Sequence, residues 1–376
     1  MKRTERPKIK PCCSLQTVAD AAGCSRMTVS LALRDRPGLP AATRERVKNV
    51  AKKLGYRANP LVSIYQAHVR ARRVPRYQAN LAWINDHPLG DIWQSTPWMV
   101  GYWEGASERA QALGFKLEQL HLSAMGATPE QAVGRAKRIL GSRGIYGVVL
   151  PWLHNTEHAS LDWSDFAVAM IGKNVSYRDN AERKTVLSFF HHSNSDVAYN
   201  LKLAWHRLHA RGFQRIGLAL DHLNDRLGES LQRGCFLIEQ EIVPRRDRVP
   251  PLVVRHFSEL LGQRELVRWF LRHQPDAVML FDTNVVKIVN AQTGFASKPF
   301  PVELSLTPNM PEFHGIDAQH ELIGASAIDL VVAQLHNNER GRPDAPREVL
   351  VKGVWREPVS GLSKPKAADR SHTALS

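Results

Sequence analysis

The sequence lacks the features that mark membrane-spanning, secreted or disulfide-stabilised proteins. In 376 residues no stretch approaches the roughly 18 consecutive apolar residues that a membrane span needs. The opening MKRTERPKIK is charged and polar, without the apolar core of a signal peptide. The four cysteines are too few and too unevenly spread for a disulfide framework or for paired metal hooks. We therefore expect a cytoplasmic protein, with no membrane partner and with reduced cysteines.

The sequence also has few signs of catalysis. We find no Walker loop, no G-x-G-x-x-G after a strand and no G-x-S-x-G elbow. The pair His191-His192 has neither the i, i+4 spacing of a helical zinc site nor an evident third ligand, so we assign it to a polar surface. We predict that the chain is not an enzyme and needs no cofactor or metal.

The positive charge is concentrated at one end of the chain. Residues 1–76 contain 18 Lys and Arg against 4 Asp and Glu, whereas the remaining 300 residues contain 33 against 32. Such a cluster repels itself unless a polyanion relieves it, and the release of counterions from nucleic acid favours binding. A solvated basic tail is the alternative explanation.

The spacing of apolar residues predicts three short helices within this basic region. The helices are expected at 14–22, 26–34 and 40–54. Ser14 and Ser25 are suitable N-caps, Gly23 and Gly55 are helix breakers, and Pro40 is tolerated in a first turn. The pattern of helix, tight turn and helix is typical of a DNA-binding motif, although generic three-helix bundles share it. In that motif Arg26, Met27 and Thr28, at the amino end of the second helix, would reach base edges in the major groove.

Two runs in this region resemble a known family. TVADAAGCSRMTVSLAL and AATRERVKNVAKKLGYRANP are similar to the DNA-binding headpiece of the lactose-repressor (LacI/GalR) family over about 45 residues. The resemblance implies that Arg26 and Met27 occupy the two variable specificity positions. It also implies further positions that commonly touch the DNA backbone or bases: Ser14, Leu15, Ser25, Thr28, Ser30, Thr43 and Asn59.

Some residues depart from the family pattern. Leu31 replaces a frequent base-contacting arginine, which removes a bidentate reader of guanine, so we expect an operator different from those of better-known members. Arg34 stands where asparagine is usual, and together with Arg26 it can supply the missing contacts.

The segment 61–76 is expected to link the headpiece to the rest of the chain. It is rich in arginine, Arg57 lies just before it, and its apolar residues have helical spacing. In the family this segment folds on operator DNA and inserts an apolar side chain into the minor groove, and Tyr65 holds that position here. An arginine-rich linker that only follows the phosphates is the alternative.

The region 77–360 alternates strand and helix patterns, which indicates parallel sheets flanked by helices. The segments ARGFQRIGLAL, PDAVMLFD and HGIDAQHELIGASAIDLVVAQL resemble the family's two-lobed, periplasmic-binding-protein-like effector core. The predicted fold is therefore α/β, with a helix-turn-helix headpiece at 1–60, a hinge at 61–76 and a two-lobed core at 77–360. The polar stretch 361–376 is expected to be disordered.

Ligands of open parallel sheets bind beyond the carboxyl ends of the strands. Aromatic, acidic, amide and arginine side chains that follow predicted strands are therefore candidates for binding a small molecule, and their chemistry suits a sugar. The effector-binding residues that we predict are Asp86, Asp91, Trp93, Arg226, His256, Phe257 and Asp282, with Asn85 nearby.

These features predict a sequence-specific transcription regulator. We expect a homodimeric repressor that binds a pseudopalindromic operator in double-stranded DNA and senses a small-molecule effector, for which a saccharide is the candidate. Activation in place of repression remains open. The alternative from another class is a solute-binding or carbohydrate-related protein with an incidental basic N-terminal arm.

Overall fold

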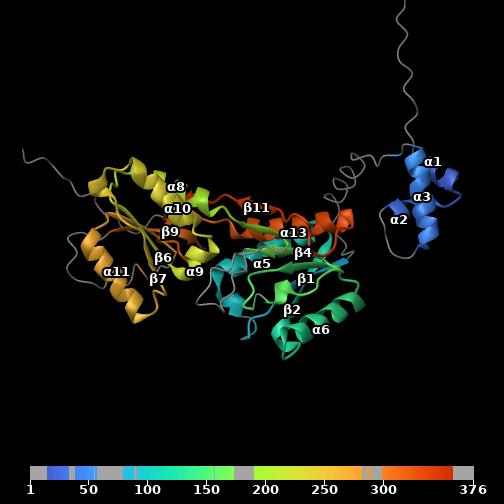
Figure 1. Cartoon of the computed structure of the whole chain (residues 1–376), viewed down its shortest axis with the longest axis horizontal. Helices are drawn as coiled ribbons and strands as arrows, with labels where there is room; N and C mark the ends of the chain where they lie inside the picture. The colour runs from blue at the N-terminus through green and yellow to red at the C-terminus, as the bar shows by residue number, and fades with distance from the viewer. Residues whose placement is uncertain are drawn as a thin grey trace, which may run out of the picture.

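The computed structural model of the chain contains a three-helix headpiece and a core with two sheets (Figure 1). The structure describes residues 15–33, 39–54, 56, 79–88, 90, 92–155, 157–172, 190–281, 285, 288 and 299–358. The predicted hinge at 61–76 and tail at 361–376 lie outside these ranges, so the proposed domain limits stay predictions. Within the described ranges, no helix combines the length and the apolarity that crossing a membrane requires.

The headpiece confirms the predicted helix-turn-helix. Its helices are α1 (Leu15–Ala22), α2 (Arg26–Leu33) and α3 (Ala41–Lys53). One small core holds them together: Val18, Ala19, Ala22, Val29, Ala32, Val47 and Ala51. Gly23 has a φ of +60°, a left-handed conformation that favours glycine, and it allows the chain to reverse between α1 and α2. Pro40 precedes α3 as the sequence predicts.

The first lobe of the core is built on a parallel six-stranded sheet in the order β11-β5-β4-β3-β1-β2. Its strands are β1 (Ala79–Asn85), β2 (Phe115–His121), β3 (Gly147–Leu150), β4 (Ala167–Ile171), β5 (His191–Ser195) and β11 (Glu348–Val351). Along β1, Leu81 and Trp83 pack against one layer of helices, whereas Ala82 and Ile84 pack against the other, since strand side chains alternate. The first layer contains α5 (Pro97–Ala112) and α13 (His320–Asn337), and the second contains α6 (Pro129–Ser142) and α7 (Glu157–Ser160).

The second lobe repeats this design in the order β12-β10-β9-β8-β6-β7. Its strands are β6 (Ile216–Asp221), β7 (Leu252–Val254), β8 (Ala277–Leu280), β9 (Phe300–Leu306), β10 (His314–Asp317) and β12 (Val354–Arg356). Its helices are α8 (Val197–Ala210), α9 (His222–Leu227), α10 (Leu231–Glu239) and α11 (Leu260–His273). Only β12 pairs antiparallel among the described strands of this sheet. The predicted α/β class with parallel sheets is confirmed, whereas β11 and β12 were not predicted.

Three short crossings connect the lobes, and one buried side chain joins two of them. The crossings lie at 195–197, 317–320 and 351–354. Asn200, which is 2% exposed, donates from Nδ2 to Ser195 Oγ at 2.9 Å and accepts from Gly353 N at Oδ1 at 2.7 Å. A Cβ atom on Gly353 would lie 2.9 Å from the carbonyl oxygen of Asp317 in the remaining crossing. The three crossings therefore form one packed junction.

Helices α5 and α13 pack against each other at the level of their backbones. A Cβ atom on Gly105 would lie 1.8 Å from the carbonyl oxygen of Glu321, and one on Gly324 would lie 2.0 Å from that of Tyr102. Both distances are far below a van der Waals contact, so only glycine fits at these two positions. The two helices therefore hold one fixed register.

We predict that Gly105→Ala lowers the free energy of unfolding by about 3 kcal/mol, because the new methyl group would force α5 and α13 apart. Gly134→Ala is the matched control, since Gly134 is exposed on α6 and its Cβ atom would meet nothing within 4 Å. This control should gain up to about 1 kcal/mol from helix propensity. Urea unfolding measures both changes, and equal stability of the two variants would contradict the close packing.

Candidate functional site

The amino end of α2 presents the residues that are expected to read DNA. Ser25 caps this helix as predicted: its Oγ accepts a hydrogen bond from Thr28 N at 3.1 Å and lies 2.9 Å from Thr28 Oγ1. Arg26 is exposed, and Met27 is 74% exposed although it is a large apolar residue. Both side chains therefore point away from the headpiece core at the helix end whose dipole favours phosphate.

The structure places only part of the predicted DNA contacts. Leu31 in α2 and Thr43 in α3 are half-buried. Leu15 and Ser30 lie in α1 and α2, but their side chains are not among those described. The other predicted contacts lie outside the described residues: Ser14, Arg34, Arg57, Asn59 and Tyr65.

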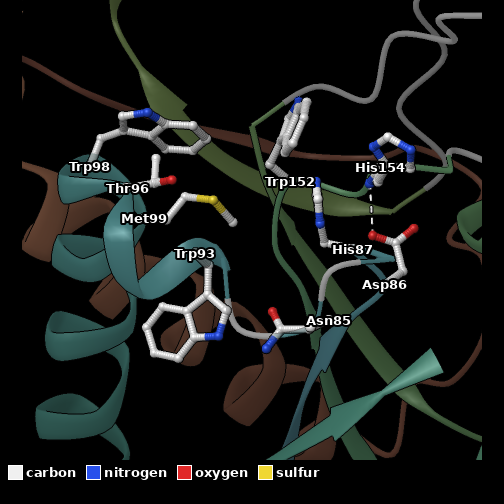
Figure 2. A pocket seen from close by; sticks show the side chains of 10 residues that line it. Asn85, Asp86, His87, Trp93, Thr96, Trp98, Met99, Trp152 and His154 are labelled. Carbon is white, nitrogen blue, oxygen red and sulfur yellow. Dashed lines mark hydrogen bonds between the residues drawn. The ribbon is translucent and has the colours of Figure 1, made fainter. Parts of the chain in front are cut away.

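A pocket of about 130 Å³ lies where β1 and β3 end in the first lobe (Figure 2). It is lined by Asn85, Asp86, His87, Gly90, Trp93, Thr96, Trp98, Met99, Trp152 and His154. Strand β5, two positions from β3 in the same parallel sheet, leads at its carboxyl end into the second lobe. The pocket therefore opens at the sheet edge where ligands of parallel sheets bind.

Aromatic rings form most of the pocket wall. Trp98, from the first turn of α5, and Trp152, which follows β3, have ring centroids 6.2 Å apart and nearly perpendicular planes. On the other side His87 and His154 have ring centroids 5.0 Å apart. Figure 2 shows these rings around one space, with Met99 beside Trp98. Such walls suit a ligand with flat apolar faces.

Asp86 supports the pocket wall through its buried carboxylate. Oδ1 accepts a hydrogen bond from His154 N at 2.7 Å, and Oδ2 accepts one from Asn155 N at 2.8 Å. Oδ2 also lies 2.9 Å from Nδ1 of His158. Both oxygens are thus occupied by the loop after β3, so this carboxylate orders that loop and offers little charge to a ligand.

Asn85 is a polar group of the pocket with capacity for another hydrogen bond. Its Oδ1 accepts from Trp83 Nε1 at 3.1 Å, while its buried Nδ2 has no hydrogen-bond partner among the described residues. The predicted effector residue Trp93 does line this pocket, but it is only 5% exposed because its ring packs against Trp103 at 5.6 Å.

The predicted effector residues of the second lobe do not line this pocket. Arg226 is exposed in α9, and His256 is half-buried after β7. Phe257 is 3% exposed and packs in the core beneath α11, so its ring is not free for a ligand. Asp91 and Asp282 lie outside the described residues.

Sequence reasoning missed several residues of the pocket. Trp98 and His87 belong to the tryptophan-rich segment after β1, and Trp152 and His154 follow β3. These residues share one sequence signal, because each follows a strand whose residues are buried. We used this signal to select Asp86 as an effector-binding candidate, but we did not use it for these aromatic residues.

The prediction of a surface location for His191 and His192 was wrong. Both are buried in β5, at 3% and 4% exposure. His191 Nδ1 accepts from Arg347 N at 2.9 Å, and His192 Nε2 lies 3.2 Å from a carboxylate oxygen of Glu348. The pair therefore fixes β11 to the sheet. In the part of the chain that the structure describes, no group of three potential metal ligands comes together.

Comparison with known proteins agrees with this organisation into a helix-turn-helix headpiece and a two-lobed core. Residues 14–59 match the model of the family described as bacterial regulatory proteins, lacI family. No curated protein matches the chain in sequence. The solved structure of the transcriptional regulator CelR with cellobiose is 17% identical, with a TM-score of 0.51 over 93% of this chain and 99% of that chain.

Two other solved structures have the same fold as the core. A periplasmic binding protein/LacI transcriptional regulator from Alkaliphilus metalliredigens, in complex with D-xylulofuranose, is 13% identical, with a TM-score of 0.51 over 76% of this chain and 99% of that chain. The trehalose repressor from Escherichia coli is 14% identical, with a TM-score of 0.51 over 74% of this chain and 99% of that chain.

The structure thus combines a helix-turn-helix headpiece with a two-lobed core of parallel sheets. The headpiece, at residues 14–59, matches the lacI family of bacterial regulatory proteins, as the sequence resemblance predicted. The core has the same fold as the solved regulators to which the chain is similar.

We predict that Arg26→Ala relaxes base preference at one or two positions of each half-site. The cost on the wild-type site should be about 1–3 kcal/mol, because a base-edge contact is lost. Lys53→Ala, at the far end of α3, removes the same charge and should retain the wild-type preference. In vitro selection from random duplexes with the full chain measures both, and unchanged preference in Arg26→Ala would contradict base reading by this side chain.

Proposed function

We propose that the chain is a homodimeric repressor that acts in the cytoplasm and whose affinity for a pseudopalindromic operator changes when a neutral saccharide binds in the first-lobe pocket. The aromatic lining of this pocket, together with the hydrogen-bonded carboxylate of Asp86, is the observation that carries the effector class. Its role is binding, and no catalytic step is assigned to it.

The lining of the pocket favours a neutral ligand with hydroxyl groups. Among the described lining residues there is no Lys or Arg, and the Asp86 carboxylate already accepts hydrogen bonds. The indole faces of Trp98 and Trp152 can stack on the apolar faces of a sugar ring, while Asn85 Nδ2 can donate to a hydroxyl group. Three proteins with similar folds are a regulator in complex with cellobiose, a regulator in complex with D-xylulofuranose and a trehalose repressor, which supports this class.

Regulation would follow from linkage between two arrangements of the lobes. The pocket belongs to the first lobe, and three crossings join it to the second. A saccharide that binds one arrangement more tightly shifts the population toward it by the difference in its affinity for the two. In a dimer this shift changes the spacing of two hinges and headpieces, and hence their fit to two half-sites. Tyr65 would contribute the minor-groove contact in each hinge.

Operator binding is tested with the full chain and genomic fragments in a gel-shift assay. We expect a subset of fragments to bind at least about 1,000-fold more tightly than random duplex, with affinity that falls steeply as salt rises. Equal binding to all fragments would favour the alternative of a binding protein with an incidental basic arm.

Saccharide binding is tested by tryptophan fluorescence of the full chain during titration with cellobiose, trehalose and other neutral sugars. We expect at least one sugar to change the emission, and Trp98→Leu to weaken its binding about tenfold through lost stacking. Tyr146→Leu, which removes a 43% exposed aromatic ring outside the pocket, should bind normally. No response from any neutral sugar, or equal weakening by both substitutions, would contradict the proposed effector site.

A further inference from the structure

One helix joins the pocket wall to a crossing between the lobes. Helix α5 carries Trp98 in its first turn, and its middle is locked by glycine against the first turn of α13. Helix α13 begins at His320, directly after the chain has come from β10 of the second lobe. Any shift of the first turn of α5 is therefore transmitted to the start of α13.

Three successive side-chain contacts follow the same route. The rings of Trp98 and Tyr102, one helical turn apart, have centroids 5.7 Å apart and planes at 71°. The rings of Tyr102 and His320 have centroids 5.4 Å apart and planes at 61°. Nε2 of His320 then lies 3.2 Å from Oγ of Ser305, in β9 of the second lobe. The route thus starts at the pocket and ends in the other lobe.

The position of His320 is closely constrained. The side chain is 5% exposed, and a Cβ atom on Gly101 would lie only 2.8 Å from its Cβ. Gln319 before it has a φ of +59°, a strained conformation for a residue other than glycine, and its N donates to Asp317 Oδ1 at 2.9 Å. Burial lowers the pKa of His320, so the imidazole is neutral at neutral pH and can share one hydrogen with Ser305.

We propose that a ligand in the pocket is coupled to the second lobe through four side chains in series: Trp98, Tyr102, His320 and Ser305. This inference rests on the proposed function, since it describes how occupation of the pocket biases the arrangement of the lobes. A ligand that moves or immobilises the Trp98 ring changes the packing of Tyr102 on His320. The hydrogen bond from His320 to Ser305 then favours one position of the second lobe over the other.

The coupling is tested without a ligand, by hydrogen–deuterium exchange of the full chain. Ser305→Ala removes the hydrogen bond between the second lobe and His320 of α13, and we expect amide exchange at 97–104 in α5 to rise about fivefold. Ser326→Ala is the matched control, because the Ser326 hydroxyl donates within α13, to Leu322 O at 2.8 Å. This control should leave exchange in α5 unchanged. Wild-type exchange at 97–104 in Ser305→Ala would overturn the proposal.

A double-mutant cycle separates coupling through the rings from general loosening. In a Tyr102→Leu background, the route is already broken, so Ser305→Ala should raise exchange at 97–104 less than about twofold. The full fivefold increase in that background would overturn the series. Hydrogen exchange is measured without sugar, so this test of the coupling does not depend on sugar binding. A chain that binds no sugar would contradict the proposed function, but the exchange of the variants could still be compared.

Discussion

The contact between the backbones of α5 and α13 is the constraint on which the regulatory part of the molecule depends. Gly105 and Gly324 allow an approach that no larger residue permits. This approach fixes α5, which carries Trp98 and Met99 into the pocket, against the helix that receives the chain from the second lobe. Ligand binding in the pocket and the position of the second lobe therefore depend on the same pair of helices. Steric exclusion, rather than hydrogen bonds alone, fixes the spacing of this pair.

The headpiece is a second functional part of the molecule, and its chemistry differs from that of the two-lobed core. Its small apolar core orients α2 so that Arg26 and Met27 are exposed at the helix end that favours phosphate. The excess of Lys and Arg in residues 1–76 attracts DNA of any sequence, whereas selectivity is proposed to come from the few exposed side chains of α2.

Most of the fold could be predicted because its signals are local. Helical spacing and Gly23 defined the headpiece, and alternating apolar runs defined the parallel sheets. The candidate site was predicted only in part, because its residues are placed by distant contacts. Asp86 is occupied by backbone groups of 154–155, and Phe257 is packed beneath α11. Strand β11 was missed because its apolar run is only three residues long, and only Val351 of that run is buried.

In the proposed mechanism, operator DNA and a saccharide bind to one coupled molecule. A closed thermodynamic cycle with the full chain tests this coupling: the Kd of a selected operator is measured with and without sugar, and the Kd of the sugar with and without operator. Linkage requires both ratios to be equal, and we expect a common factor of at least about five. Operator and sugar affinities that are each unaffected by the other ligand would disprove the coupling.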